Sequence, residues 1–202
     1  MKTILLTGFE PFGGSSINPS IEACKTYDGK VINEAKIKVV QIPLKYEEVR
    51  PSITKAIEET KPAAIICTGQ SGSGTINLER LAINVADARI PYNCGTQPVD
   101  KTIEPDGPVA YFSTLPLRKL LAALTEAKIP SVISNSAGTF GCNHIFYELM
   151  HYRAENKVNI PAGFIHVPSL PEQVIGKKQP SMALSLITEA LGVVLEILSK
   201  EI

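Results

Sequence analysis

The sequence lacks tryptophan, has four cysteines with no C-x-x-C pair, and carries no net charge. Its 20 Lys and Arg residues balance 20 Asp and Glu residues, so no overall electrostatic attraction to nucleic acid or an anionic membrane is expected. No apolar stretch is long enough to cross a bilayer, and the amino-terminal run is too short for a signal sequence. No Cys/His spacing typical of a metal site occurs. We therefore expect a cytoplasmic protein with free thiols and no metal or cofactor.

Short apolar runs alternate with amphipathic segments along the chain, and no linker or internal repeat interrupts them. The runs predict strands at 2–7, 36–43, 63–68, 131–135 and 162–167. The amphipathic segments predict helices at 18–27, 47–60, 117–127, 142–155 and 182–200. Residues 75–89 read as extended segments, and 90–108 as a long irregular excursion. This pattern predicts one domain, residues 1–202, built as a three-layer α/β/α sandwich around a mostly parallel, twisted sheet.

Two glycine-rich loops follow predicted strands, where α/β proteins place their ligands. The first carries Phe9 and Phe12, which are either two core anchors in a turn or the walls of a flat apolar slot for a small ring. The second begins at Gly69 and includes Gln70. Neither loop has the glycine spacing of a phosphate-binding motif, so we expect no phosphate site there.

Cys142 is the cysteine with a reactive setting, because a turn of small residues leads from a predicted strand to this position at a helix start. The unpaired N–H groups and the dipole of a helix N-terminus favour thiolate over thiol. Cys24 and Cys67 fall in a predicted helix and a buried strand, where cysteine behaves as a small hydrophobe. Cys94 falls in the irregular region, with nothing nearby that we expect to activate it.

Of the three histidines, His166 interrupts an apolar strand and must find a polar partner. It is either a satisfied core residue or the base that activates Cys142 from a neighbouring strand end. His144 and His151 lie on the predicted helix after Cys142 and read as surface or helix–helix contacts.

A third polar group would orient the imidazole, and Glu79, Asp87 and Glu172 all remain candidates. Glu79 could instead pair with its neighbour Arg80. Arg89 could form an ion pair with Asp87 or stabilise an oxyanion.

Six blocks in this order resemble the pyroglutamyl peptidase I (pyrrolidone carboxyl peptidase) family of cysteine peptidases. They span residues 7–19, 76–84, 86–91, 110–116, 134–143 and 163–168. The resemblance implies hydrolysis of an N-terminal pyroglutamyl residue through a thioester intermediate, without a cofactor, in a cytoplasmic homotetramer. It places the nucleophile at Cys142, the base at His166 and the acid at Glu79. Substrate contacts would come from Phe9, Phe12, Asn18, Gln70 and Arg89.

The chemistry of pyroglutamate suits these residues, because its ring is a flat, uncharged lactam. An aromatic slot matches the ring, while backbone groups and Gln70 could pair its N–H and C=O. A free amino terminus would be rejected, since an ammonium would be buried without a partner. Two alternatives remain: a nucleoside phosphorylase-like enzyme on a similar sheet, and a non-catalytic module that binds a capped peptide end.

Overall fold

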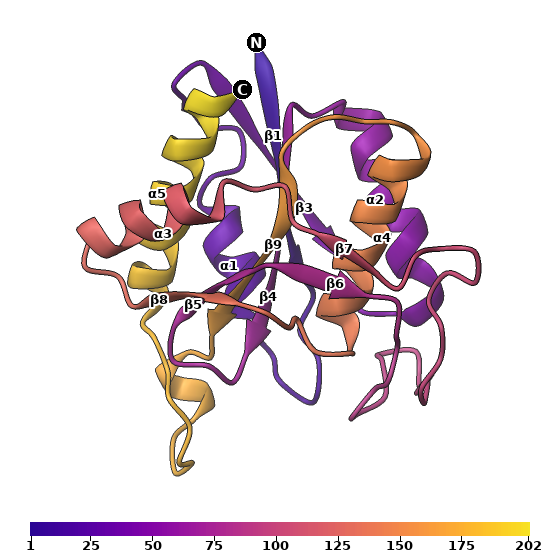
Figure 1. The fold of residues 1–202 in the computed structure, drawn as a ribbon. Coiled ribbons are helices and arrows are strands. Elements are labelled where there is room, and N and C mark those ends of the chain that lie inside the picture. The colour runs from indigo at the N-terminus through magenta and orange to yellow at the C-terminus, as the bar shows by residue number, and fades with distance from the viewer.

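The computed structural model describes all residues, Met1–Ile202, and is built around one seven-stranded sheet (Figure 1). In their order across the sheet the strands are β2 (Val31–Ile32), β3 (Ala35–Ile42), β1 (Lys2–Phe9), β4 (Ala64–Ser71), β9 (Ala162–Pro168), β5 (Ile76–Glu79) and β8 (Ser131–Ser134). Four strand pairs are parallel, while β2 with β3 and β5 with β9 are antiparallel. The predicted mostly parallel sheet is confirmed.

Burial along the strands explains their composition. The central strand β9 is buried at every position, and β1 and β4 are buried over six consecutive residues each. Strands covered on both faces need continuous apolar runs, which is the pattern seen in the sequence. Near the sheet edge, β3 begins by alternating buried and exposed residues because its lysines face solvent.

Helices cover both faces of the sheet (Figure 1). On one face lie α1 (Pro19–Lys25), α3 (Leu117–Glu126) and α5 (Leu184–Glu201); on the other lie α2 (Val49–Thr60) and α4 (Gly141–Glu155). Short 3₁₀ helices, η1 (Tyr46–Glu48) and η2 (Pro171–Gln173), complete the elements. Each face has its own apolar core, so the molecule has the three layers that the sequence predicts. None of these helices is both long and apolar enough to cross a membrane.

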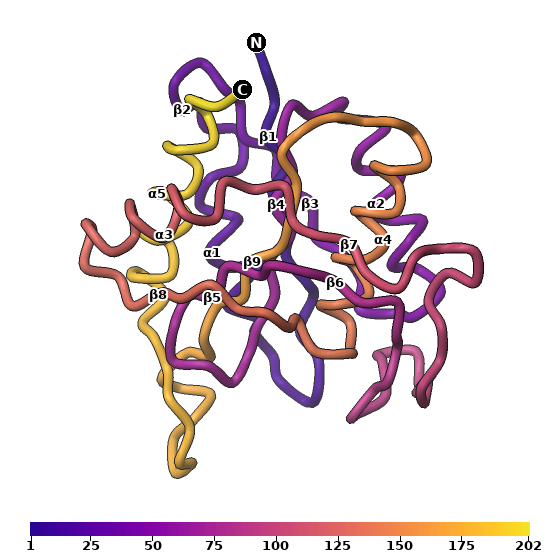
Figure 2. Tube along the Cα trace, viewed as in Figure 1, coloured from indigo at the N-terminus to yellow at the C-terminus, as the bar shows by residue number.

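A small second sheet pairs β6 (Leu81–Ile83) with β7 (Ala110–Phe112) in antiparallel fashion. The chain between these strands forms the irregular excursion predicted for 90–108, with a single isolated bridge between Ala86 and Lys101. Figure 2 shows the excursion looping out on the side of the sheet that carries α2 and α4.

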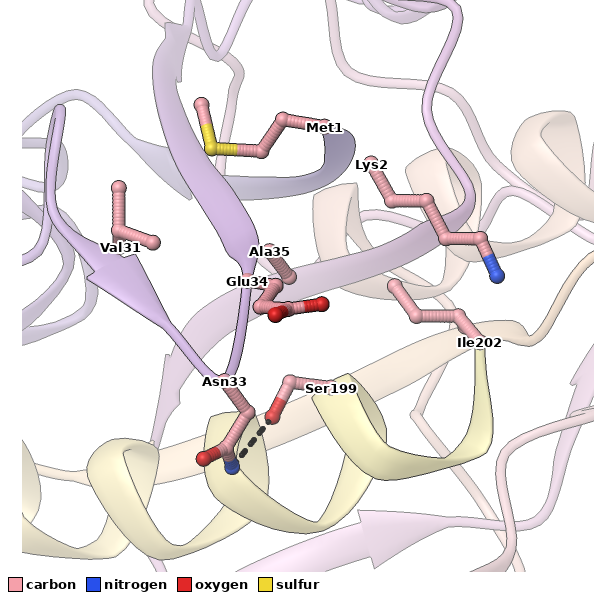
Figure 3. A pocket seen from close by; sticks show the side chains of 8 residues that line it. All are labelled: Met1, Lys2, Val31, Asn33, Glu34, Ala35, Ser199 and Ile202. Atoms are coloured by element: carbon pink, nitrogen blue, oxygen red, sulfur yellow. Dashed lines mark hydrogen bonds between the residues drawn. The ribbon is translucent and has the colours of Figure 1, made fainter.

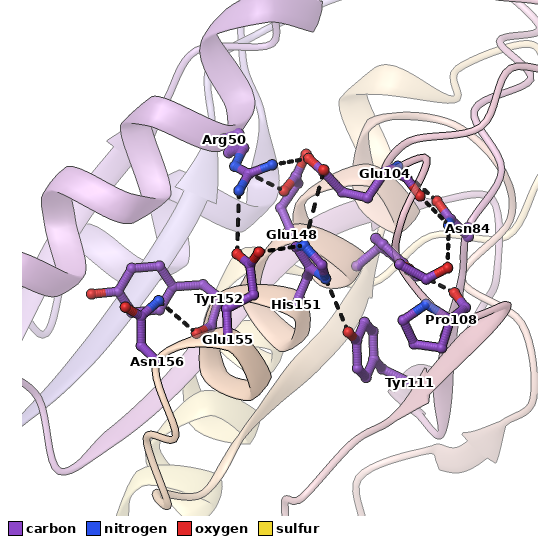
Figure 4. Close-up of polar contacts among 12 residues, drawn as sticks. Arg50, Asn84, Glu104, Pro108, Tyr111, Glu148, His151, Tyr152, Glu155 and Asn156 are labelled. Atoms are coloured by element: carbon purple, nitrogen blue, oxygen red, sulfur yellow. Dashed lines mark hydrogen bonds and ion pairs between the residues drawn. The ribbon is translucent and has the colours of Figure 1, made fainter.

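Polar contacts tie this excursion to both helices (Figure 4). Glu104, within the excursion, forms an ion pair with Arg50 of α2, and its backbone pairs with the side chain of Asn84. Arg50 also lies 3.7 Å from Glu148 and 3.3 Å from Glu155, both on α4. A segment without regular hydrogen bonding is thus held in place by side chains.

The structure differs from the sequence-based elements at several points. Strands β2 and β7 were not predicted, because they are only two and three residues long. The first helix is shorter than expected, and the last begins two residues later, at Leu184. The direction of β5, antiparallel to β9, was also not predicted, and it decides the geometry of the site.

Candidate active site

Cys142 is the second residue of α4 and is half-buried. The helix has no side-chain cap, and the backbone N–H groups of Gly141, Cys142 and Asn143 have no acceptor within the protein. The turn before the helix is anchored by two hydrogen bonds between Thr139 and Asp87: the Asp87 N–H donates to the Thr139 carbonyl, and the Thr139 hydroxyl donates to the Asp87 carbonyl. The result is an uncapped helix start that presents a thiol and free N–H groups together.

The Cys142 sulfur lies against Gly69 of β4. A Cβ atom placed on Gly69 would be 2.5 Å from Sγ, and 2.8 Å from Cζ of Phe164. Gly69 is also the residue in register with His166 across the β4–β9 pair. The bare backbone at Gly69 therefore makes the space in which the thiol approaches the strand that carries the imidazole.

His166 is held by Glu79, whose carboxylate is fully buried. The His166 Nδ1 atom lies 2.8 Å from Oε1 of Glu79. Because β5 runs antiparallel to β9, Asn77 faces His166, and Glu79, two residues further on, presents its side chain to the same side of the sheet. The other Glu79 oxygen, Oε2, has no hydrogen-bond partner. An ionised carboxylate can only accept, so Nδ1 donates and Nε2 remains for Cys142.

The His166 ring is buried, and its charge depends on its neighbours. Burial disfavours the imidazolium, but the charge and hydrogen bond of Cys142, together with Glu79, outweigh it and raise the pKa of His166 to about 10. Phe164 packs edge-on against the ring, with centroids 4.9 Å apart. The site thus favours a protonated imidazole beside the Cys142 sulfur at neutral pH.

Known proteins are similar to this chain in sequence and in fold. The family model described as pyroglutamyl peptidase matches residues 2–201. The chain belongs to the pyroglutamyl peptidase family.

The relatives agree along almost the whole chain. Pyrrolidone-carboxylate peptidase of Brevibacillus brevis is 49% identical over 199 residues, covering 97% of this chain and 92% of that protein. The Vibrio campbellii protein of the same name is 48% identical over 193 residues, covering 95% and 90%. A crystal structure of Bacillus amyloliquefaciens pyroglutamyl peptidase I superposes with a TM-score of 0.96 at 41% identity, covering 99% and 98%. A mutant pyrrolidone carboxyl peptidase from Pyrococcus furiosus gives 0.95 at 40%, covering 98% and 99%.

The structure also shows where the other two candidates for orienting the imidazole, Asp87 and Glu172, lie. Asp87 accepts a long 3.4 Å hydrogen bond from the Asp100 N–H and has no ion pair with Arg89. Glu172 lies on the wall of a cavity. Arg80 donates to Asn135 at 2.8 Å and forms no ion pair with Glu79. Of the three candidate acids, Glu79 is the one that contacts His166.

A polar cavity of ≈ 630 Å³ opens at the carboxyl ends of β1, β4 and β9, and its lining includes neither Cys142 nor His166. Its lining includes Phe12, Gln70 and Arg89. Phe12 lies 6.1 Å, centroid to centroid, from Phe140, which directly precedes the helix of Cys142. Phe12 thus links the cavity wall to the residue before α4.

Two residues predicted to bind substrate do not line this cavity. Phe9 is buried in the core under α2 and α4. Asn18 is fully buried and caps α1: its oxygen accepts from Ser20, and its amide donates to the Glu10 carbonyl. Both support the loop that carries Phe12, and their contact with substrate stays a prediction.

The remaining histidines are buried and not on the surface as expected, and their polar partners lie in the excursion, in β7 and on α4 itself instead of on another helix. His144 lies 3.3 Å from the Tyr92 hydroxyl and 3.5 Å from Glu148. His151 lies 2.9 Å from the Tyr111 hydroxyl and 3.3 Å from Glu155 (Figure 4).

The other cysteines differ from one another. Burial raises the pKa of Cys24 and of Cys67 to about 12, as suits inert core thiols. The prediction that nothing near Cys94 would activate it is wrong, since a hydrogen bond with Thr96 lowers its pKa. Cys94 is nevertheless exposed and has no histidine partner.

Sequence reasoning missed two supporting residues. Gly69 was read only as part of a loop, although a glycine at the end of a predicted strand can signal close approach of another group to the backbone. Asn143 is buried and bonds three backbone groups: it accepts from the Ile83 N–H and donates to the carbonyls of Ile83 and Val85. It thereby attaches the start of α4 to β6, the strand after Glu79.

A further cavity of ≈ 560 Å³ lies at the opposite end of the sheet, near both termini (Figure 3). Its lining includes Lys2 and Ala35, at the starts of β1 and β3, and an Asn33–Ser199 hydrogen bond of 3.1 Å. None of the residues considered for catalysis reaches it.

Proposed function

We propose that the chain removes the N-terminal pyroglutamyl residue from peptides, with Cys142 as nucleophile, His166 as base and Glu79 as the residue that orients the imidazole. The observation that carries this proposal is the arrangement around His166: a buried carboxylate 2.8 Å from Nδ1, and the Cys142 thiol on the other side. The printed names of the relatives, pyrrolidone-carboxylate peptidase and pyroglutamyl peptidase I, support the same activity.

In the first half of the reaction, the Cys142 thiolate attacks the pyroglutamyl carbonyl carbon and a C–S bond forms. The carbonyl oxygen becomes an oxyanion. Collapse of this intermediate breaks the C–N bond, and imidazolium His166 gives its proton to the departing amine. A thioester on Cys142 and a shortened peptide result.

In the second half, His166 takes a proton from water, and the resulting hydroxide attacks the thioester carbonyl. Collapse breaks the C–S bond, releases pyroglutamate and restores the thiolate beside imidazolium. Glu79 holds the same Nδ1–H throughout, which keeps Nε2 directed at the reacting atoms.

The uncapped start of α4 suits the oxyanion. The free N–H groups of Gly141, Cys142 and Asn143 lie beside the attacking sulfur and have no protein acceptor. Because a side-chain cap would occupy these donors, its absence leaves them for the charge that develops on the substrate oxygen.

The cavity that Phe12 lines is the proposed site for the pyroglutamyl ring and the start of the leaving peptide. Phe12 supplies an apolar surface for the uncharged ring. Gln70 and Arg89 supply hydrogen-bond donors, and Arg89 has no ion-pair partner within the protein. Asn18 and Phe9 contribute by holding the Phe12 loop.

The deciding experiment is hydrolysis of a fluorogenic pyroglutamyl amide by the wild-type chain and by Cys142→Ala. Rapid cleavage by the wild type and none by the variant is expected. A binding module would cleave with neither, and a phosphorylase-like enzyme would release sugar phosphate from a nucleoside and inorganic phosphate. Either result would overturn the proposal.

We further propose one catalytic domain over residues 1–202, a homotetramer, and a cytoplasmic location. Exposed apolar side chains, among them Val109 at 87% and Phe112 at 67%, could be covered by subunit contacts. Light scattering coupled to size-exclusion chromatography would measure the assembly, and a monomer at micromolar concentration would contradict it.

A further inference from the structure

One side chain of the excursion, Tyr92, reaches the start of the helix that carries Cys142. Tyr92 is 2% exposed, although it comes from a segment without regular secondary structure. Its ring centroid lies 4.7 Å from that of Phe140, the residue directly before α4. Its hydroxyl oxygen lies 3.3 Å from Nδ1 of His144, in the first turn of α4. The excursion therefore contacts residues on both sides of Cys142 in the sequence.

These two contacts hold the two ends of one helical turn. The His144 N–H donates to the Phe140 carbonyl at 2.9 Å, and this is the first backbone hydrogen bond of α4. Cys142 lies midway between the two residues. The backbone of a helical turn moves as a unit, because its dihedral angles and hydrogen bonds are fixed. Holding both ends therefore fixes the position from which the Cys142 side chain extends.

Tyr92 is itself held firmly enough to act as a support. Its N–H donates to the Thr96 carbonyl at 2.9 Å, and the N–H of Asn93 donates to the Leu44 carbonyl at 2.9 Å. Gly141, the first residue of α4, lets both segments approach the helix closely. A Cβ atom on Gly141 would overlap the Leu44 side chain and lie 3.8 Å from Cε1 of Tyr92. The excursion and the loop after β3 thus pack together against the start of α4.

The hydroxyl group of Tyr92 is buried and has one polar contact in the protein, with His144. Burial raises the pKa of Tyr92, and the charges of Tyr46 and Cys142 raise it further. The hydroxyl is therefore neutral at neutral pH. Whichever of the two atoms donates, the hydrogen bond joins the excursion to α4. Because a buried polar group without a partner is costly, this bond favours the position of His144 seen in the structure.

We propose that Tyr92 is a positioning residue for the reaction of Cys142. Through Phe140 and His144 it fixes the start of α4, and the place of the Cys142 sulfur beside His166 follows from that start. This inference rests on the proposed function, in which Cys142 is the nucleophile. Tyr92 does not line the cavity proposed for the substrate, so its replacement should affect the reaction step more than substrate binding.

A second tyrosine provides a matched control on the same helix. The hydroxyl of Tyr111 lies 2.9 Å from Nδ1 of His151, which is the same kind of contact (Figure 4). His151 comes nine residues after Cys142, or about 13 Å along the helix axis. Replacing Tyr111 therefore removes a tyrosine–histidine contact from α4 without disturbing the turn that carries the thiol.

The test measures kcat and KM on a pyroglutamyl amide and the rate at which iodoacetamide alkylates Cys142. All variants carry Cys94→Ser, because Cys94 is also exposed and would react. Tyr92→Phe loses only the hydroxyl and should lower kcat by roughly 3- to 10-fold. Tyr92→Leu also loses the ring and should lower kcat by roughly 100-fold, with KM changed by less than about threefold. Alkylation should slow in the same order, because a displaced thiol loses the imidazole that favours its thiolate.

Tyr111→Phe and Tyr111→Leu should keep kcat and the alkylation rate within about twofold of the parent. Thermal unfolding shows whether each variant is folded, and if Tyr92→Leu is not, the comparison of Tyr92→Phe with Tyr111→Phe decides.

Equal losses of kcat in the Tyr92 and Tyr111 variants would overturn the inference, because general weakening of α4 would then account for them. A folded Tyr92→Phe with parental kcat and alkylation rate would also overturn it, as would a rise in KM with kcat unchanged. Failure of the wild type to cleave pyroglutamyl amides would instead refute the proposed function. The alkylation rates need no substrate, so they test Tyr92 in that case too and keep the two failures distinguishable.

Discussion

Replacing Gly69 by alanine tests how closely the site is packed around the nucleophile. The added methyl group points at the Cys142 sulfur, with ideal Cβ to Sγ only 2.5 Å, while its other neighbour is the Phe164 ring at 2.8 Å. Gly69 makes no side-chain contact of its own, so the substitution adds atoms without removing any interaction.

The size of the effect follows from these distances. Ordinary van der Waals contact begins at 3.4 Å, so the sulfur must retreat by about 0.9 Å, the difference between 3.4 and 2.5 Å. A cysteine side chain has one torsion, and its staggered positions lie about 120° apart, so escape by rotation carries Sγ away from His166. A misplacement of about 1 Å at a reacting atom can cost roughly 100-fold in rate. Overpacking also destabilises by about 1–3 kcal/mol.

The assay is kcat/KM on a pyroglutamyl amide, together with the rate at which iodoacetamide alkylates Cys142 and the midpoint of thermal unfolding. We expect kcat/KM to fall by about 100-fold and alkylation to slow. Gly72→Ala is the matched control, because its added Cβ would find its nearest atom, Gln179 Nε2, at 4.0 Å. If folded Gly69→Ala keeps kcat/KM within about threefold of this control, the reacting Cys142 sulfur does not lie against Gly69.

The remaining predictions concern the catalytic groups and their support. Cys142→Ser should abolish hydrolysis, while Cys94→Ser keeps wild-type rates; residual iodoacetamide-sensitive activity in Cys142→Ser would contradict the thiol mechanism. Glu79→Gln should lower kcat/KM by about 10²–10⁴-fold. Because Glu79 is one of the groups that raise the pKa of His166 to about 10, imidazolium-dependent activity is present below that pH and lost above it. The alkaline limb of the kcat/KM profile should therefore move to lower pH in Glu79→Gln, and an unmoved limb would refute the coupling. Asn143→Ala leaves three backbone groups unpaired and should lower the free energy of unfolding by about 2–4 kcal/mol, measured by urea denaturation; a change below about 0.5 kcal/mol would refute this support. A prolyl amide should be cleaved far more slowly than the pyroglutamyl amide. Equal rates would show that the enzyme does not recognise the lactam carbonyl of the substrate.

Most of the regular elements were predictable because their signals are local. The buried strand at 162–167 is an apolar run broken only by His166, and the helix that begins at Gly141 follows a turn of small residues. These patterns arise from neighbours along the chain, so they survive in the sequence alone. The misses were β2 and β7, of two and three residues, and the exact ends of helices, where few residues carry the signal.

The site was predictable only in part. Cys142 stands out by its position at a helix start, and His166 by interrupting an apolar strand. The choice of Glu79 over Asp87 and Glu172 came from family resemblance, because periodicity and spacing do not say which strand lies beside which.

By itself, the sequence determined an α/β protein of balanced charge, with a cysteine delivered to a helix N-terminus at one end of its strands. Tertiary structure decided which groups meet that cysteine. Glu79 reaches His166 across 87 residues of chain because β5 runs antiparallel to β9, and the thiol finds room because Gly69 lies in register with the histidine. Strand pairing is non-local, and a shift of one residue turns every side chain to the other face, so no window of sequence contains this information.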